Sequence, residues 1–340
     1  MPYRFKLDED VRRGFRRIAR EQVDLALSEL NSDLVPPASV HASRKAMKRL
    51  RALVCAAAPA MGLKTARKHD KSIRDIARLL SQRRDADVCL DTLCSLETHF
   101  GAEAVAVLPP LRAHLSASAA AAGGAIDAET LRVVRQRLTN SSKRLEKLQL
   151  TGRGLETIAA GIELSYRAGR TAHNKAYRKP SDENFHDLRK SVQVHWRQMA
   201  LLSRAWPEEF AVRVAAAREL SQLLGDDHDL AILKLAARGL SDADQSIICK
   251  LCQRRQIELR TAARARAERL YCEKPSAFGS RMKGYWKAGR RIKAAAMPAL
   301  ASLPGHADAT GGEPSPPPNT GSQPRLAAKT PATAQSQRRA

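Results

Sequence analysis

Residues 37–58 of the chain read PASVHASRKAMKRLRALVCAAA, and residues 182–204 read DENFHDLRKSVQVHWRQMALLSR. Both stretches are rich in good helix formers, and their apolar residues recur at intervals of three and four, the period of an amphipathic α-helix. Each contains the pattern His-x-x-Arg-Lys, and the two histidines, His41 and His186, are 145 residues apart. The sequence therefore predicts two helices that are copies of one another.

Two further matches in the same order extend this repeat. LLSQRRDADVCL at residues 79–90 is similar to LLGDDHDLAIL at residues 223–233, with Asp85 matching Asp229 at a separation of 144 residues. Upstream, Arg17-Ile-Ala-Arg20 matches Arg167-Ala-Gly-Arg170 if the second half has a loop five residues shorter. The chain is therefore interpreted as a duplication, which suggests two helical bundles facing each other across a pseudo-twofold axis.

The same periodicity covers most of the chain and no alternating run indicates a strand, so the predicted fold class is all-α. The expected helices are 8–30, 37–58, 62–82, 86–99, 103–122, 128–150, 154–178, 182–204, 208–224, 227–239, 242–272 and 277–296. Residues 1–295 are predicted to form the folded domain, with half one at about 1–115, half two at about 127–295 and a hinge in the segment 116–125. Residues 304–340, rich in proline, glycine, serine and threonine, are expected to be disordered.

The chain is strongly basic, with 59 lysine and arginine residues against 35 acidic ones and a net charge of +24. A charge of this size attracts polyanions such as nucleic acid, acidic membranes or polyphosphates. Aromatic residues make up 4% of the sequence, whereas proteins that grip single-stranded nucleic acid stack bases on aromatic rings. With no signal peptide, no apolar run long enough to span a membrane and only six cysteines, a cytoplasmic protein with reduced thiols is expected.

Helical geometry gathers much of this charge on one face of each repeated helix. In the first copy His41, Arg44, Lys48 and Arg51 fall within an arc of roughly 80°, opposite the apolar Met47, Leu50 and Val54. In the second copy His186, Arg189, Lys190 and Arg197 share a face opposite Leu188, Val192 and Met199.

Further basic stripes occur at residues 13–20, 64–78 and 167–178. A solvated face usually carries acids that pair at i, i+4; these stripes have few, which favours a shared anionic ligand bound by arginine forks and lysine charges.

The motifs His41-x-x-Arg44-Lys45-x-x-Lys48-Arg49-x-Arg51, Arg84-Asp85-x-Asp87-Val88 and His186-x-x-Arg189 followed by LLGDDHD (223–229) resemble the CHAD family, the conserved histidine α-helical domain. The segment Glu273-Lys-Pro-x-x-Phe278 with Arg281 and Tyr285-Trp286 resembles the last helix of that family, so the resemblance covers roughly residues 3–295. It implies two pseudo-symmetric bundles of about four core helices each around a basic central channel. It also implies binding of inorganic polyphosphate, with localisation to polyphosphate granules, and no catalysis.

The resemblance and the basic stripes together give the candidate polyphosphate-binding residues. These are His41, Arg44, Lys45, Lys48, Arg49, Arg51, Arg17, Arg20, Lys71, Arg74, Arg167, Arg170, His186, Arg189, Lys190 and Arg197. The second copy departs from the first, since Gln193 and Trp196 stand where the first has Lys48 and Arg51. The neighbouring Arg197 and His195 are expected to supply the missing charge. No catalytic residue, metal or cofactor is predicted.

Three alternatives remain open from the sequence. Non-specific nucleic-acid (RNA) binding is compatible with the charge, because phosphate contacts provide most non-specific affinity. A metal-dependent phosphohydrolase is suggested by the three pairs His69-Asp70, His186-Asp187 and His228-Asp229, although Asp226, Asp227 and Asp229 are expected to cap the start of a helix. Cys249-x-x-Cys252 could form half of a zinc site, but no second pair exists, so a structural role is expected.

Overall fold

The computed structural model describes residues 3–32, 34–80, 84–121 and 126–301. These residues form α-helices and one short 3-10 turn, with no strand among them, which confirms the predicted all-α class. The helices are α1 (Val11–Glu29), α2 (Pro37–Ala56), α3 (Ala58–Met61), α4 (Leu63–Leu79), α5 (Arg84–Phe100), α6 (Ala102–Val107), α7 (Pro109–Ala121), α8 (Ala128–Glu146), α9 (Glu156–Arg178), α10 (Asp182–Leu202), α11 (Pro207–Ala236), α12 (Asp242–Leu270) and α13 (Pro275–Ala301), with the 3-10 turn at Ala237–Gly239. Within these ranges, no helix has both the length and the apolar composition needed to cross a membrane.

Several helices begin where local chemistry requires it. Pro37 and Pro207 occupy the first turn of α2 and α11, where the missing proline N–H breaks no hydrogen bond. The Ser181 hydroxyl caps α10 by accepting a hydrogen bond from the backbone N–H of Asn184. These signals fix the starts of α2 and α10, the two helices that carry the repeated motif.

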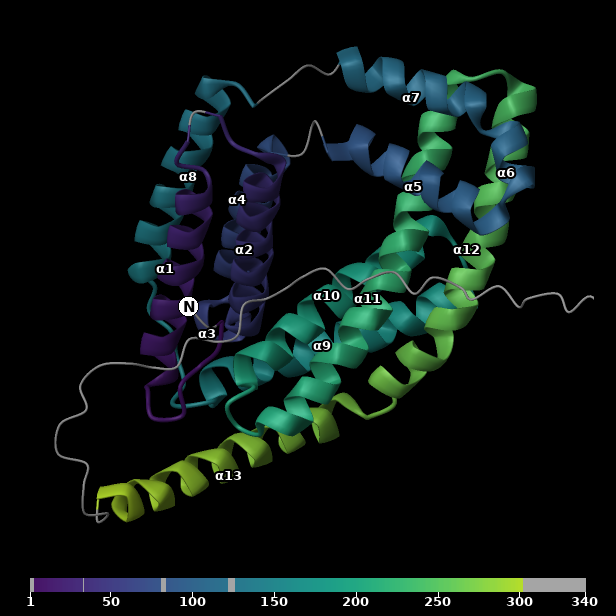
Figure 1. Cartoon of the computed structure of the whole chain (residues 1–340). Helices are drawn as coiled ribbons and strands as arrows, with labels where there is room; N and C mark the ends of the chain where they lie inside the picture. The colour runs from purple at the N-terminus through teal and green to yellow at the C-terminus, as the bar shows by residue number, and fades with distance from the viewer. Residues whose placement is uncertain (1–2, 33, 81–83, 122–125, 302–340) are drawn as a thin grey trace, which may run out of the picture. The chain divides into compact units, whose positions relative to one another are not determined.

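Residues 1–295 form one compact unit, and its main apolar core surrounds α2 and α10. Helix α2 packs against α1, α4, α9 and α10, while α10 also packs against α9 and α11. Figure 1 shows α1, α2, α4 and α8 running side by side, with α8 against α1 and α4. The α2–α10 contact thus joins the two copies of the motif within one core.

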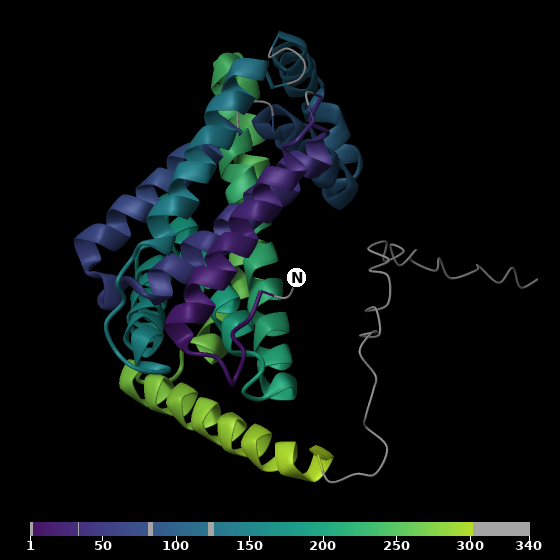
Figure 2. The same ribbon diagram turned by 90° about the vertical axis from the view of Figure 1, so that its left-hand side faces the viewer.

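A second apolar core lies among α5, α6, α7, the C-terminal part of α11 and the N-terminal part of α12. Leu93 and Leu111 from the first half pack there with Leu233 and Ile248, all almost fully buried. Figures 1 and 2 both show α5 beside the end of α11 that is remote from α13, in agreement with the α5–α11 contacts. Residues that precede the predicted hinge therefore pack on helices that follow it. The division into halves near residues 116–125, part of which lies outside the described residues, stays a prediction.

Helices α2 and α9 approach each other so closely that one position requires glycine. A Cβ atom on Gly161 would lie 2.0 Å from the carbonyl oxygen of Ala56, which is far inside van der Waals contact. The absent side chain lets the backbone of α9 contact the end of α2. This contact holds α9 against the face of α2 that carries Arg51 and Cys55.

The predicted helix boundaries were wrong at two places. Residues 208–224 and 227–239 were expected as separate helices, but α11 continues from Pro207 to Ala236, so Asp226, Asp227 and Asp229 lie inside it and do not cap a start. Gly225, within the expected break, lies beside Arg189, whose nearest guanidinium nitrogen would be 3.6 Å from an added Cβ atom. Conversely, the expected helix 103–122 is divided at Pro109 into α6 and α7.

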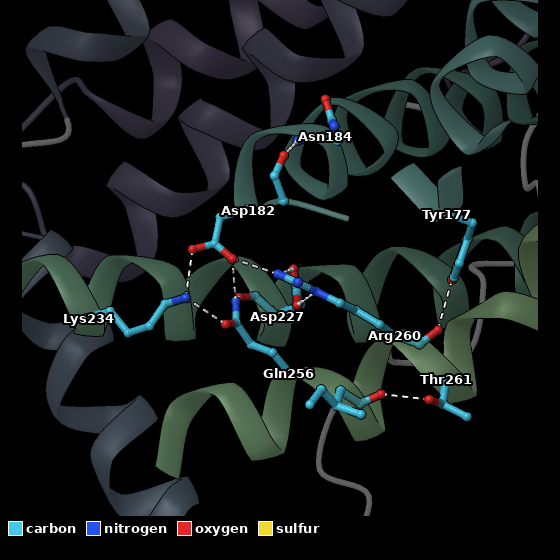
Figure 3. A network of polar contacts seen from close by, with 10 residues as sticks. Tyr177, Asp182, Asn184, Asp227, Lys234, Gln256, Arg260 and Thr261 are labelled. Atoms are coloured by element: carbon cyan, nitrogen blue, oxygen red, sulfur yellow. Dashed lines mark hydrogen bonds and ion pairs between the residues drawn. The ribbon is translucent and has the colours of Figure 1, made fainter. Parts of the chain in front are cut away.

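Asp227 belongs to a polar network that ties α10, α11 and α12 together (Figure 3). Arg260 Nε donates to Asp227 Oδ1 at 2.6 Å and Arg260 Nη2 donates to Asp182 Oδ1 at 2.6 Å. Lys234 Nζ lies 2.7 Å from Asp182 Oδ2 and donates to Gln256 Oε1 at 2.8 Å. The Gln256 amide in turn donates to the backbone carbonyl of Asp227 at 3.0 Å.

The network satisfies a carboxylate that water hardly reaches, since Asp227 is 1% exposed. Burial raises the pKa of Asp227 even with the Arg260 guanidinium beside it. Burial opposes ionisation of Asp182 as well, but hydrogen bonds from Lys234 and Arg260 lower its pKa overall. The start of α10 is therefore fixed to α11 and α12 by compensated charge.

Replacing Arg260 with methionine is expected to lower the free energy of unfolding by about 3 kcal/mol, because Asp227 is left as a buried charge without its partner. Arg264→Met, four residues along the same helix, removes the exposed Arg264–Glu268 pair and is expected to cost less than about 0.5 kcal/mol. Urea denaturation measures both. Loss of the guanidinium raises the pKa of Asp227 further above its unfolded value, so the deficit is expected to be largest near neutral pH and to shrink as the pH falls through that pKa. Equal losses in the two variants would contradict the role of the network.

Candidate functional site

A cavity of about 610 Å³ lies where α2, α4, α9 and α10 meet. Its lining includes seven basic side chains from three of these helices and one carboxylate, Asp70. The basic residues are Lys48, Arg51, Arg67, Lys71, Arg74, Lys190 and Arg197. Helices α2 and α4 supply five of them and α10 supplies two. The cavity thus brings together cations from both helices that carry the repeated motif, and it is called here the α2–α10 cavity.

Helical spacing explains why these side chains share the cavity. Lys48, Arg51 and Cys55 follow the i, i+3, i+7 positions of α2 and face it. On the opposite side, Met47 and Leu50 are 1% exposed in the core. In α10, Lys190, Gln193 and Arg197 repeat this spacing. Lys48 and Arg51 of α2 and Lys190 and Arg197 of α10 thus line one cavity, but Val54, expected on the core face opposite, lines it as well.

The carboxylate in the cavity does not face the ligand space as a free negative charge. Arg51 Nε donates to Asp70 Oδ1 at 2.7 Å and Arg51 Nη2 donates to Asp70 Oδ2 at 3.1 Å, a two-bond fork between α2 and α4. Lys71, the residue after Asp70, pairs with Asp75 at 3.1 Å. The rim thus keeps a net positive charge while one of its arginines is held in a fixed orientation.

Arg197 is the most deeply buried cation of the cavity, with 5% of its surface exposed. Its Nη1 donates to the Gln193 carbonyl at 2.6 Å, its guanidinium lies 4.1 Å from the Trp196 ring centroid, and its Nε has no hydrogen-bond partner. Among the described residues no carboxylate pairs with it. Burial, together with the neighbouring Arg49, lowers the pKa of Arg197 to about 10, so the group stays charged at neutral pH.

The two His-x-x-Arg motifs lie toward the N-terminal ends of the same helices. Arg44 Nη1 donates to the Ala77 carbonyl on α4 at 2.8 Å, while His41 is exposed. Arg189 lies beside Gly225 of α11. His186 stacks on His228 with ring centroids 4.0 Å apart, in a second cavity of about 450 Å³ lined by α10, α11 and α12. The described structure therefore brings Lys48, Arg51 and Arg197 together but places His186 in a separate hollow.

The stacked histidines carry little positive charge at neutral pH. Burial lowers the pKa of His186, and the nearby Lys190 and Arg189 lower it further. Burial and the neighbouring His186 lower the pKa of His228 to about 3. His195, which was expected to supply charge, was wrongly assigned. It is 2% exposed, lies against Tyr166, Tyr271 and Phe278, and burial lowers its pKa to about 3.

Several other candidate residues pair with acids, some one turn away on the same helix and some from other segments. Arg17 binds Glu9 and Glu21, and Arg20 binds Glu146 of α8 at 2.7 Å. In the second copy, Arg167 pairs with Glu163 and Lys190 with Asp187, whereas Arg170 donates to the Glu273 carbonyl. Neither Arg17 nor Arg20 lines the α2–α10 cavity.

Lys45 and Arg49 also point elsewhere. Lys45 is exposed on α2. Arg49 lies over the ring of Tyr3 at 5.7 Å, and the Tyr3 hydroxyl donates to the Arg49 carbonyl at 2.7 Å. Burial lowers the pKa of Arg49. This residue therefore fastens the N-terminal segment to α2.

The sequence did not identify the wall that α9 contributes. Gly161, Leu164, Ser165 and Ala168 recur at three and four and line the cavity. This short stripe carries no charge, so no anion-binding signal marked it. Ser165 Oγ lies 3.3 Å from Cys55 Sγ and accepts a hydrogen bond from the Gln198 amide at 3.0 Å. These contacts link α9 to both α2 and α10 beneath the basic rim.

The histidine–aspartate pairs and the cysteine pair do not assemble into larger clusters in the described part of the chain. No group of three His, Cys, Asp or Glu side chains there is placed to hold a metal ion. Asp70 binds Arg51, and Asp187 binds Lys190. Cys252 is fully buried in the second apolar core and Cys249 lies one turn away in α12.

Comparisons with known proteins agree with this fold. The model of the CHAD domain family matches residues 15–238. Among solved structures, PptA from Streptomyces chartreusis is similar with a TM-score of 0.50 and 15% sequence identity, over 76% of this chain and 98% of that chain. No curated protein matches the sequence. The structural similarity supports the helical fold and, at this identity, nothing beyond it.

Replacing Arg197 with methionine is expected to leave the free energy of unfolding within about 1 kcal/mol of wild type or to raise it, because an uncompensated buried charge is removed at similar volume. Arg281→Met serves as the control. Arg281 pairs with Glu273 through two hydrogen bonds, so its loss is expected to cost about 1–3 kcal/mol. Denaturant titration of the ligand-free protein measures both. A larger loss for Arg197→Met than for Arg281→Met would show that Arg197 has a stabilising role.

Proposed function

We propose that this chain, which belongs to the CHAD domain family, binds inorganic polyphosphate through the α2–α10 cavity and the basic faces that lead into it. The single observation that carries the proposal is Arg197, a cation 5% exposed with no carboxylate partner in the described residues. An unpaired buried charge is costly unless a counter-charge arrives. A phosphate group in the cavity supplies that counter-charge.

The distribution of charge suits a repeating anion. Basic side chains come from α2, α4 and α10 around one cavity, and His41, Arg44 and Arg189 continue the basic faces of α2 and α10 beyond it. Guanidinium groups match pairs of phosphate oxygens, and lysines add charge without fixed direction. A chain of linked phosphates can contact several of them at once, which a single phosphate ion cannot.

The family resemblance supports the same ligand and adds expectations about its setting. It implies a binding protein in place of an enzyme, a basic central channel between pseudo-symmetric halves, and a cytoplasmic protein associated with polyphosphate granules. Nucleic acid is the alternative partner. None of the described residues that line the cavity is aromatic, so it lacks the series of rings on which proteins that grip single strands stack successive bases.

Binding of long-chain polyphosphate is expected to weaken steeply with salt. Each neutralised phosphate releases counterions, at a slope of about −0.7 per contact for a single strand, so several contacts give a log–log slope on the order of −4 or steeper. Fluorescence anisotropy of end-labelled polyphosphate measures it, with unlabelled RNA as competitor at equal phosphate concentration. A flat salt response would exclude the proposal, and equal competition by RNA would favour the nucleic-acid alternative.

Charge reversal on the two repeats tests whether they share one ligand. Arg74→Glu on α4 and Lys190→Glu on α10 each place a repulsive charge at the cavity, so each is expected to weaken long-chain binding at least about tenfold. The double variant is expected to bind more weakly than either. Lys250→Glu makes the same charge change on an exposed position of α12 and is expected to change affinity little. Circular dichroism checks that all variants stay helical, and unchanged affinity in folded Arg74→Glu and Lys190→Glu would disprove the shared site.

A further inference from the structure

The α2–α10 cavity has an apolar wall that an inorganic phosphate chain would leave unused. Leu63 of α4 and Leu164 of α9 both line it, and they are 53% and 45% exposed. Val54, Ala66 and Ala168 continue the apolar surface from three helices. When a ligand covers large exposed apolar side chains, their surface is removed from water, and this lowers the free energy of the complex.

From this arrangement we propose that the cavity also binds a nucleoside polyphosphate, with its phosphates on the basic rim and its nucleoside against the apolar wall. The inference rests on the proposed function, since the same cations meet the phosphates. Arg197, a cavity-lining cation about 95% buried with no carboxylate partner in the described residues, adds positive charge beside the rim cations that meet the phosphates. The volume of about 610 Å³ lies within the range of roughly 300–1,000 Å³ usual for small-molecule sites.

Polar groups among the apolar ones favour a nucleoside over a lipid chain. The Gln193 side chain lines the cavity and makes no hydrogen bond to the described part of the protein, so its amide can pair with the edge of a base. Asp70, held by Arg51, and the Ser165 hydroxyl also line the cavity. An acyl chain would desolvate the Gln193 amide without giving it a partner.

The test compares ATP with inorganic tripolyphosphate, which has the same number of linked phosphates and no nucleoside. Calorimetric titration of the full chain in magnesium-free buffer is expected to show tighter binding of ATP, although ATP carries less charge per phosphate. Leu164→Ser is expected to weaken ATP binding by about tenfold, because it removes apolar contact, and to leave tripolyphosphate unaffected. Ile257→Ser, at a position 65% exposed on α12, is the matched control and is expected to change neither ligand.

The rate of cysteine alkylation supplies a second readout, which reports where on the protein ATP binds. Cys55 lines the cavity and Cys272 is exposed outside it. ATP is expected to slow alkylation of Cys55 by iodoacetamide and to leave that of Cys272 unchanged, as measured by mass spectrometry. The reaction is followed at alkaline pH, because burial raises the pKa of Cys55.

The outcomes separate this inference from the proposed function. Binding of tripolyphosphate and long-chain polyphosphate without tighter binding of ATP, or ATP binding that Leu164→Ser does not alter, would overturn the nucleotide site and leave the polyphosphate proposal standing. Octyl phosphate competing as well as ATP would overturn it in favour of a lipid phosphate. Failure of every phosphate ligand to bind would overturn both.

Discussion

The contact between α2 and α10 is the constraint on which the rest of the site depends. The amide of Gln198 on α10 reaches both the Ala52 carbonyl of α2, at 3.4 Å, and Ser165 of α9, while Gly161 lets α9 close against the end of α2. Because the apolar faces of both helices are buried in one core, their basic faces cannot turn away from one another. Packing of uncharged residues thus dictates where the cations gather.

The molecule treats its buried charges in two different ways. Around Arg260, two carboxylates, a lysine and a glutamine complete a closed network that fixes α10 to α11 and α12. At Arg197, on the same helix as Asp182, no such compensation is built in the described residues. The paired charges around Arg260 connect α10, α11 and α12, whereas Arg197, which has no carboxylate partner in the described residues, lies at the cavity. This contrast is the physical basis for placing function at Arg197 and stability at Arg260.

The sequence predicted the features that depend on local periodicity and missed those that depend on distant partners. Three-and-four spacing identified α2 and α10 and placed Arg197 on the correct face, because the core residues Leu188 and Val192 lie opposite. His195 was misplaced because its aromatic neighbours Tyr271 and Phe278 come from far along the chain. In the arginine stripe of α1, the partner Glu21 lies four residues after Arg17 and is visible in the sequence, but Glu9 precedes the helix and Glu146 belongs to α8, so these two partners were not visible as i, i+4 pairs. The expected break between residues 224 and 227 is absent, because α11 continues through Gly225.

An unpaired Arg197 also explains why a carboxylate would be unfavourable at the base of the cavity. A protein carboxylate there would satisfy the guanidinium and stabilise the ligand-free fold, but it would compete with every incoming phosphate and repel it after binding. In the proposed complex the uncompensated charge would gain its counter-charge, so the stabilisation missing from the empty protein would appear on binding. The Trp196 ring, 4.1 Å from the guanidinium, lowers the cost of the empty state without occupying the cavity, since a ring face attracts a cation but offers no charge that a phosphate must displace.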